Sequence, residues 1–222
     1  MLNYITLITN IDTDHLSSYK DDFSLLRKAF LDFIHNLPFY GLVALCIDDK
    51  TLQELLPEIK RSFVTCAINF DADYRAVNIR YEGLSSNFDI VVKATNERFT
   101  VGLSLPGEHN VLNALAAIAI TSILGIESRD CKLGIMNFKG VEHRLESICK
   151  VNDIEFINDS VATTPNRTMT GLESIDDPII LLLGGQDKNL DFKKLEKIIN
   201  QKCRVVIVFG ISRKKILQEI SN

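Results

Sequence analysis

Four short apolar runs, separated by segments with helical periodicity, constrain the fold of this chain more than any other feature. They occupy residues 4–9, 42–47, 179–183 and 205–209. Their continuous, largely β-branched apolar character is typical of strands buried on both faces. Between them, apolar side chains recur at helical spacing, as in residues 23–37. The alternation of strand and helix predicts parallel strands joined by crossover helices, and therefore an α/β fold.

The middle of the chain follows a different pattern. Residues 62–104 carry short alternating runs with polar breaks between them, which predict a small antiparallel sheet. An alanine-rich helix is expected over residues 110–124, where Gly125 ends it, and a second helix reaches Phe138. Gly140 follows at the position where a hinge is expected.

The hinge divides the chain into an expected first domain, residues 1–140, and a second, residues 141–222. In the second domain, three predicted strands alternate with helices, and these strands cover residues 155–158, 179–183 and 205–209. This rhythm predicts a parallel sheet of three or slightly more strands flanked by helices.

Composition excludes several classes of protein. With 222 residues and 46% hydrophobic content, the chain can bury one large core or two modest ones. A net charge of -4 argues against a nucleic-acid-binding surface. The five cysteines include no CxxC pair, and no apolar run approaches the roughly 20 residues that span a bilayer. The N-terminus has no basic region followed by a cleavable apolar one. These features predict a cytoplasmic protein without a membrane span.

Two segments in the first domain carry residues suited to ligand binding. Residues 9–15 follow the opening strand, and His15 lies there among carboxylates that could orient a divalent ion. The alternative is a helix-capping aspartate beside a surface histidine. In residues 107–117, Asn110 and Asn113 share one helix face near its N-terminus, where free N–H groups attract polar ligands and an amide matches an adenine edge. The alternative is that Asn110 is a cap and Asn113 a tolerated polar residue.

Two further segments lie in the second domain. Residues 158–165 run from a strand end into a helix start, where Asp159 could accept hydrogen bonds from ribose hydroxyls. The two threonines before Pro165 alternatively cap the helix that this proline opens. After the next strand, the glycines at 184–185 would let backbone approach a ligand, and Lys188 offers a point charge for a carboxylate or phosphate. A plain turn with a solvated lysine is the alternative.

In this order, the four segments make the chain resemble the Mur ligases, ATP-dependent enzymes that join amino acids to the muramoyl precursor of bacterial cell wall. Residues 138–146 resemble the family's hinge into its C-terminal domain. The resemblance implies contacts for six residues: a magnesium ion at His15, the nucleotide at Asn110, Asn113 and Asp159, the ATP phosphates at Arg144, and the carboxylate of the incoming amino acid at Lys188.

The resemblance also implies an architecture. Residues 1–140 would be the C-terminal part of the central ATPase domain, and residues 141–222 a truncated Rossmann-like C-terminal domain. The implied cofactors are ATP and Mg²⁺, and the implied substrates are a UDP-N-acetylmuramoyl precursor and an amino acid. No GxxxxGK[ST] loop is present in the 222 residues. The chain is therefore expected to be an incomplete ligase that also lacks the UDP-binding domain and is inactive alone. The rival hypothesis is a remnant or separate module that at most binds nucleotide or a partner subunit.

The two ends of the chain resemble different members of the family. Residues 14–19 and 35–41, the latter reading HNLPFYG, resemble the L-alanine-adding ligase, whereas residues 158–165 and 184–192 resemble the D-glutamate-adding ligase. A hybrid of two paralogues is one explanation. Val161 stands where other D-glutamate ligases carry a lysine. Because the family's third domain supplies the amino-acid site, the sequence favours D-glutamate over L-alanine. The related folylpolyglutamate synthetases share the architecture, but the HNLPFYG run argues against them.

Overall fold

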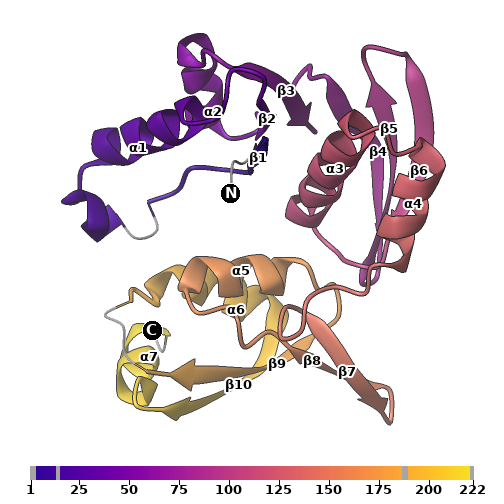
Figure 1. Ribbon diagram of the computed structural model, residues 1–222. Helices are drawn as coiled ribbons and strands as arrows, with labels where there is room; N and C mark the ends of the chain where they lie inside the picture. Colours follow the sequence, from indigo (N-terminus) through magenta and orange to yellow (C-terminus); the bar gives the residue numbers. More distant parts are fainter. Residues whose placement is uncertain (1–3, 14–15, 187–189, 221–222) are drawn as a thin grey trace. The chain divides into compact units, whose positions relative to one another are not determined.

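The computed structural model describes residues 4–13, 16–186 and 190–220, and these fall into two compact units. Unit 1 comprises Met1–Phe138 and unit 2 comprises Lys139–Asn222 (Figure 1). The division lies immediately before Gly140, whose φ of 93° is readily adopted by glycine. Each unit is described by itself.

Unit 1 is built on one mixed sheet whose strands follow the chain order. The strands are β1 (Ile5–Ile8), β2 (Leu42–Cys46), β3 (Ser62–Ala67), β4 (Tyr74–Glu82), β5 (Ser85–Val92) and β6 (Glu97–Leu103). The accompanying helices are α1 (Phe23–His35), α2 (Lys50–Leu55), α3 (Glu108–Ile123) and α4 (Ser128–Asn137), with 3-10 turns η1 (Leu16–Tyr19) and η2 (Leu56–Glu58). β1 to β4 are parallel neighbours, and β4 to β6 are antiparallel.

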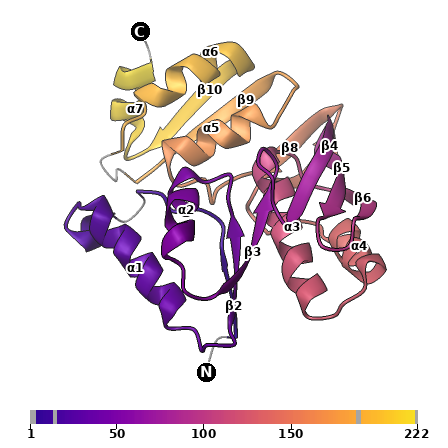
Figure 2. The same ribbon diagram turned by 90° about the horizontal axis from the view of Figure 1, so that it is seen from above.

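The strand β2, which lies between β1 and β3, has an unbroken apolar sequence because it is covered on both faces. Val43 and Leu45 belong to the cluster packed by α1 and α2, whereas Cys46 belongs to the cluster packed by α3 and α4. All three side chains are fully buried. The helices α1 and α2 thus lie on one side of the parallel strands and α3 on the other (Figures 1 and 2). A strand covered on both faces has no solvated side on which polar residues are tolerated.

The antiparallel part has one packed face and one polar face. Phe88 and Ile90 of β5 point into the cluster beneath α3, and both are almost fully buried. On the polar face, the Asp89 carboxylate accepts hydrogen bonds from Arg98 at 2.8 Å and from the Thr100 hydroxyl at 2.7 Å. These bonds hold the pKa of Asp89 well below its usual range. This alternation along β5 is the pattern that predicted an antiparallel sheet.

The predicted antiparallel sheet began too early in the chain. β3 was placed in it, but β3 pairs parallel with β2 from Leu42↔Ser62 to Cys46↔Cys66. Only its last two residues reach β4, also in parallel. The alternating run at residues 62–67 is partly exposed at its start and buried at its end. That pattern fixes a strand but not the direction of its neighbour.

Unit 2 contains two separate pairs of strands. The antiparallel pair is β7 (Glu146–Val151) with β8 (Ile154–Asn158), and the parallel pair is β9 (Ile179–Gly185) with β10 (Cys203–Gly210). The helices are α5 (Pro165–Glu173), α6 (Glu196–Lys202) and α7 (Arg213–Ile220), with the 3-10 turn η3 (Lys193–Leu195). Leu172 of α5, Leu195 of η3 and Ile216 of α7 pack on one face of the parallel pair.

The expected three-stranded parallel sheet is therefore wrong for the described part of unit 2. The strand predicted at 155–158 pairs antiparallel with β7, a strand that was not predicted. The two are joined by Asn152 and Asp153, whose φ values of 48° and 64° form a two-residue turn. Such a turn can connect only antiparallel neighbours.

Candidate functional site

The parallel strands of unit 1 end on a common edge, where two adjacent aspartates join the loops. Asp48 accepts hydrogen bonds from the N–H groups of Ile68, at 2.6 Å, and Asn69, at 2.9 Å. Asp49 accepts a bond of 3.4 Å from the N–H of Ile11 and caps α2. The loops after β1, β2 and β3 are thus held together. The sequence analysis missed both aspartates, although their place directly after the strand at 42–47 was the available signal.

The N-terminus of α3 adjoins this edge, because Asn69 donates a hydrogen bond of 3.3 Å to Glu108, the first residue of the helix. Asn110 is buried and donates from Nδ2 to the Pro106 carbonyl at 2.7 Å. Asn113 is exposed on the next turn, and its side-chain amide makes no hydrogen bond among the described residues. One asparagine therefore stabilises the helix start, while the other presents its amide to solvent.

The described carboxylates on this edge do not form a metal site. Asp48 and Asp49 are committed to backbone N–H groups, and Asp12 accepts the N–H of Thr13 at 2.6 Å. Within residues 4–13, 16–186 and 190–220, no group of three or more metal-ligating side chains is present. His15, the predicted magnesium ligand, lies outside the described residues.

In unit 2, Arg144 lies on a tight turn before β7. Its N–H donates to the Val141 carbonyl at 3.1 Å, and its side chain is exposed. A local ion pair of Arg144 with Glu142 or Glu146 would be the alternative to a phosphate role. Glu146 instead accepts the His143 N–H at 2.7 Å, and the described residues supply no ion-pair partner for Arg144.

Asp159, at the end of β8, lies against the same turn. Its Oδ1 accepts a hydrogen bond of 3.1 Å from the N–H of Leu145. Burial raises the pKa of the Asp159 carboxyl, while this bond and the positive charge of Arg144 act in the opposite direction. The structure therefore brings Asp159 and Arg144 together, two residues that the sequence placed in separate segments. Thr164 caps α5 ahead of Pro165, as one alternative in the sequence analysis predicted.

Gly184, the first glycine of the pair at 184–185, has a packing explanation, whereas Gly185 has a φ of 138° and open space around it. A Cβ at Gly184 would collide with the carbonyl of Phe209, and one at Gly210 would lie 2.9 Å from the backbone nitrogen of Gly185. These glycines allow β9 and β10 to approach closely, which accounts for them without a ligand. Lys188, predicted to contact a carboxylate, lies outside the described residues.

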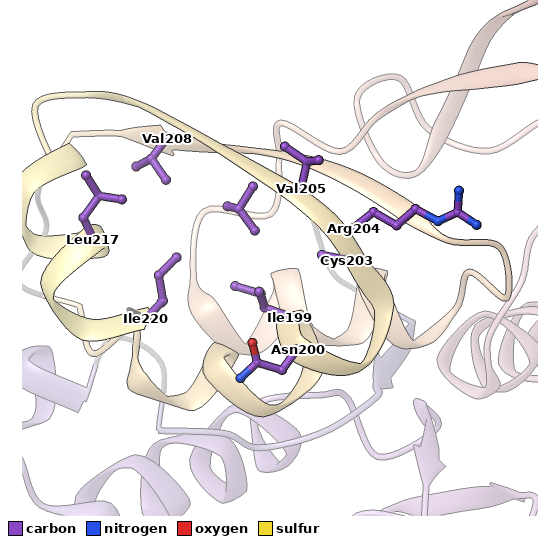
Figure 3. Close-up of a pocket in the computed structure, with 9 residues that line it drawn as sticks. Ile199, Asn200, Cys203, Arg204, Val205, Val208, Leu217 and Ile220 are labelled. Carbon is purple, nitrogen blue, oxygen red and sulfur yellow. The ribbon is translucent and has the colours of Figure 1, made fainter. Parts of the chain in front are cut away.

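A pocket of about 330 Å³ lies elsewhere in unit 2, beside β10 and between α6 and α7 (Figure 3). Nine residues line it, six of them with aliphatic side chains: Ile199, Asn200, Cys203, Arg204, Val205, Val206, Val208, Leu217 and Ile220. Arg204 points away from the apolar centre in Figure 3. None of the predicted site residues lines it.

Comparison with known proteins assigns the family. The model of the Mur ligase middle domain matches residues 3–121, more than half of the chain and the whole of the edge that carries Asn110 and Asn113. The chain belongs to the Mur ligase family. The resemblance recognised in the sequence is thereby confirmed.

Relatives agree with this assignment over different shares of their length. A UDP-N-acetylmuramate–L-alanine ligase of Dichelobacter nodosus is 46% identical over 140 residues, which are 63% of this chain and 29% of that protein. The crystal structure of the UDP-N-acetylmuramate–alanine ligase MurC from Thermotoga maritima matches with a TM-score of 0.80 and 23% identity, covering 100% of this chain and 49% of that one. MurF ligase from Thermotoga maritima in complex with ADP matches with a TM-score of 0.72 and 15% identity, covering 98% of this chain and 55% of that one.

This Mur ligase chain thus spans about half the length of these solved structures, and less of the curated relative. The structural likenesses confirm the mixed α/β fold. No helix in the described ranges has the length and apolar character to cross a membrane.

Proposed function

We propose that this chain is part of an ATP-dependent ligase of peptidoglycan synthesis. Such a ligase would phosphorylate the terminal carboxylate of a UDP-N-acetylmuramoyl precursor, and the amine of an amino acid would then displace phosphate to form an amide. The observation that carries the proposal is the family match over residues 3–121. That range includes the α3 N-terminus, where the exposed Asn113 amide is available to a nucleotide.

The residue roles follow the resemblance. We assign Asn110 and Asn113 to the nucleotide and Arg144 to the ATP phosphates, because an exposed guanidinium without an ion-pair partner among the described residues can bind two phosphate oxygens at once. A relative that binds ADP supports ATP as the cofactor. When bound, Mg²⁺ would neutralise phosphate charge. Its proposed ligand is His15, and Lys188 is proposed for the incoming carboxylate.

For the amino acid, we propose L-alanine. The Dichelobacter nodosus relative is an L-alanine ligase, and its 46% identity over 140 residues supports the same substrate here. The sequence analysis favoured D-glutamate from residues 158–165 and 184–192, and the comparisons do not support that preference. Gly184 in the second segment has a packing explanation, which weakens its value as a substrate signal.

The test is a chimera in which residues 1–222 replace the matching half of Thermotoga maritima MurC. We expect phosphate release and amide formation with UDP-N-acetylmuramate and L-alanine. Little product is expected with UDP-N-acetylmuramoyl-L-alanine and D-glutamate. The parent MurC, assayed in parallel, sets the reference rate. Product from D-glutamate alone would show that the second half of this chain imposes the other specificity, and the L-alanine proposal would be wrong.

The purified 222-residue chain is expected not to hydrolyse ATP above background. No loop in its sequence matches the glycine-rich pattern whose backbone N–H groups cradle the phosphates. Release of radiolabelled phosphate measures this, with heat-denatured protein as the blank. Turnover that disappears in His15→Ala would show that the chain has another means of holding the phosphates.

A further inference from the structure

The turn that carries Arg144 has an unusual backbone. The residues on either side of Arg144, His143 and Leu145, have φ values of 67° and 45°, in the left-handed region. Residues other than glycine rarely occupy this region, and a bulky side chain such as leucine is unusual there. Two such residues in one short turn persist when surrounding contacts fix them.

Contacts to the end of β8 supply this restraint on both sides of Arg144. The Leu145 N–H donates to Asp159 Oδ1 at 3.1 Å, and the Val161 N–H donates to the His143 carbonyl at 3.2 Å. The His143 ring also lies 2.9 Å from Asn158 Nδ2. The turn is therefore bonded to the loop between β8 and α5, within unit 2.

The Asp159 carboxylate fits against α5 because Gly171 of that helix has no side chain. A Cβ at Gly171 would lie 2.8 Å from Asp159 Oδ2 and 3.6 Å from Leu145 Cδ2. Gly171 is buried inside the helix and is not among the glycines with positive φ. Helical backbone alone would favour alanine there. The room that glycine leaves is occupied by the Asp159 carboxylate.

We propose that Asp159 is a positioning residue for Arg144. Its carboxylate lies against Gly171, accepts the Leu145 N–H, and thereby fixes the backbone from which Arg144 extends. The inference rests on the proposed contact of Arg144 with the ATP phosphates. It adds that one oxygen of Asp159 is already engaged by the protein, so the role of this residue is not confined to the nucleotide contact implied by the resemblance.

The sharpest test uses two glycine substitutions of opposite expected effect. Gly134 lies in α4, and a Cβ there meets nothing within 4 Å. Gly134→Ala should therefore leave the turn unchanged and favour its helix. Gly171→Ala gains the same helical preference but displaces Asp159. We expect Gly171→Ala to speed amide hydrogen exchange at Leu145 by roughly 3- to 10-fold, the factor for loss of one ordinary hydrogen bond.

The measurement is NMR-detected exchange and backbone ¹⁵N relaxation on the full 222-residue chain. Asp159→Ala should speed exchange at Leu145 and increase backbone motion at residues 143–145, while the amides of β9 keep their protection. Asp159→Asn should restore both readouts, because the amide oxygen can accept the same N–H. In the Asp159→Ala background, adding Gly171→Ala should change the turn no further.

Three outcomes would overturn the inference. Gly171→Ala could behave like Gly134→Ala at residues 143–145, or Asp159→Ala could leave Leu145 exchange unchanged. Alternatively, exchange in β9 could rise together with that of the turn, which would make Asp159 a general stabilising residue. These readouts require neither ATP nor ligation, so their failure is distinct from failure of the proposed function, which the chimera tests.

Discussion

Replacing Phe88 by alanine is expected to lower the free energy of unfolding of unit 1 by about 3–5 kcal/mol. Phe88 is 1% exposed and belongs to the cluster that joins β4, β5 and β6 to α3. Its removal loses the transfer free energy of the ring and leaves a cavity that closely packed neighbours fill only in part. Urea denaturation followed by far-UV circular dichroism, with the transition of unit 1 fitted separately, measures the change.

Phe39→Ala is the matched control, because it removes the same ring from a side chain that is 86% exposed. It should change the stability by no more than about 0.5 kcal/mol. If the two variants lose similar stability, or if Phe88→Ala costs less than about 1 kcal/mol, the packing beneath α3 is not as close as described. This pair therefore tests the part of the fold that supports the α3 N-terminus.

Secondary structure could be predicted where the spacing of apolar residues within a segment indicates which of its faces are buried. The helix expected at residues 23–37 is α1, and the strand expected at 42–47 is β2. An amphipathic stripe suits a helix that packs one face on a core, and a continuous apolar run suits a strand covered on both faces. The alanine-rich helix is α3, which is covered on most of its surface. Predicting these elements did not require knowing which neighbouring element each would contact.

Strand pairing was less accessible, because it depends on the partner. β3 and β8 were both recognised as strands, yet each was assigned the wrong neighbour or direction. For β8, a local signal existed and was missed. Asn152 and Asp153 are residue types that tolerate positive φ, and a pair of them between two runs of alternating character favours a hairpin. For β3, no comparable local signal distinguishes a parallel from an antiparallel neighbour.

Only those features of the candidate site that depend on the position of a residue within its own helix or strand could be predicted. Asn110 and Asn113 could be placed near the start of α3 from helical spacing, but spacing did not show that Asn110 is buried against the Pro106 carbonyl while Asn113 is exposed. The hydrogen bond between Leu145 and Asp159 could not be predicted, because it joins a strained turn to a distant strand end. The reason for glycine at 171 is likewise invisible in sequence, since it is the carboxylate on another element that needs the space.

Replacing Arg144 by alanine in the MurC chimera is expected to lower kcat for ligation about 10³-fold, equivalent to about 4 kcal/mol of transition-state stabilisation. A guanidinium that contacts transferring phosphate stabilises charge that spreads over its oxygens, and alanine offers no donor in its place. Arg144→Lys should retain part of the rate, because lysine keeps the charge but lacks the two-pronged donor geometry. Rapid-quench measurement of acyl-phosphate-dependent phosphate release separates this step from substrate binding.

The control for Arg144 is Arg204→Ala, which removes another exposed arginine, from β10 in the same unit. Arg144 has no ion-pair partner among the described residues, so neither substitution should alter stability by more than about 0.5 kcal/mol. A loss of rate confined to Arg144→Ala would then reflect contact with the substrate complex. If Arg144→Ala keeps the full rate, the phosphate role is wrong, and the strained turn that holds this residue must serve the stability of unit 2 alone.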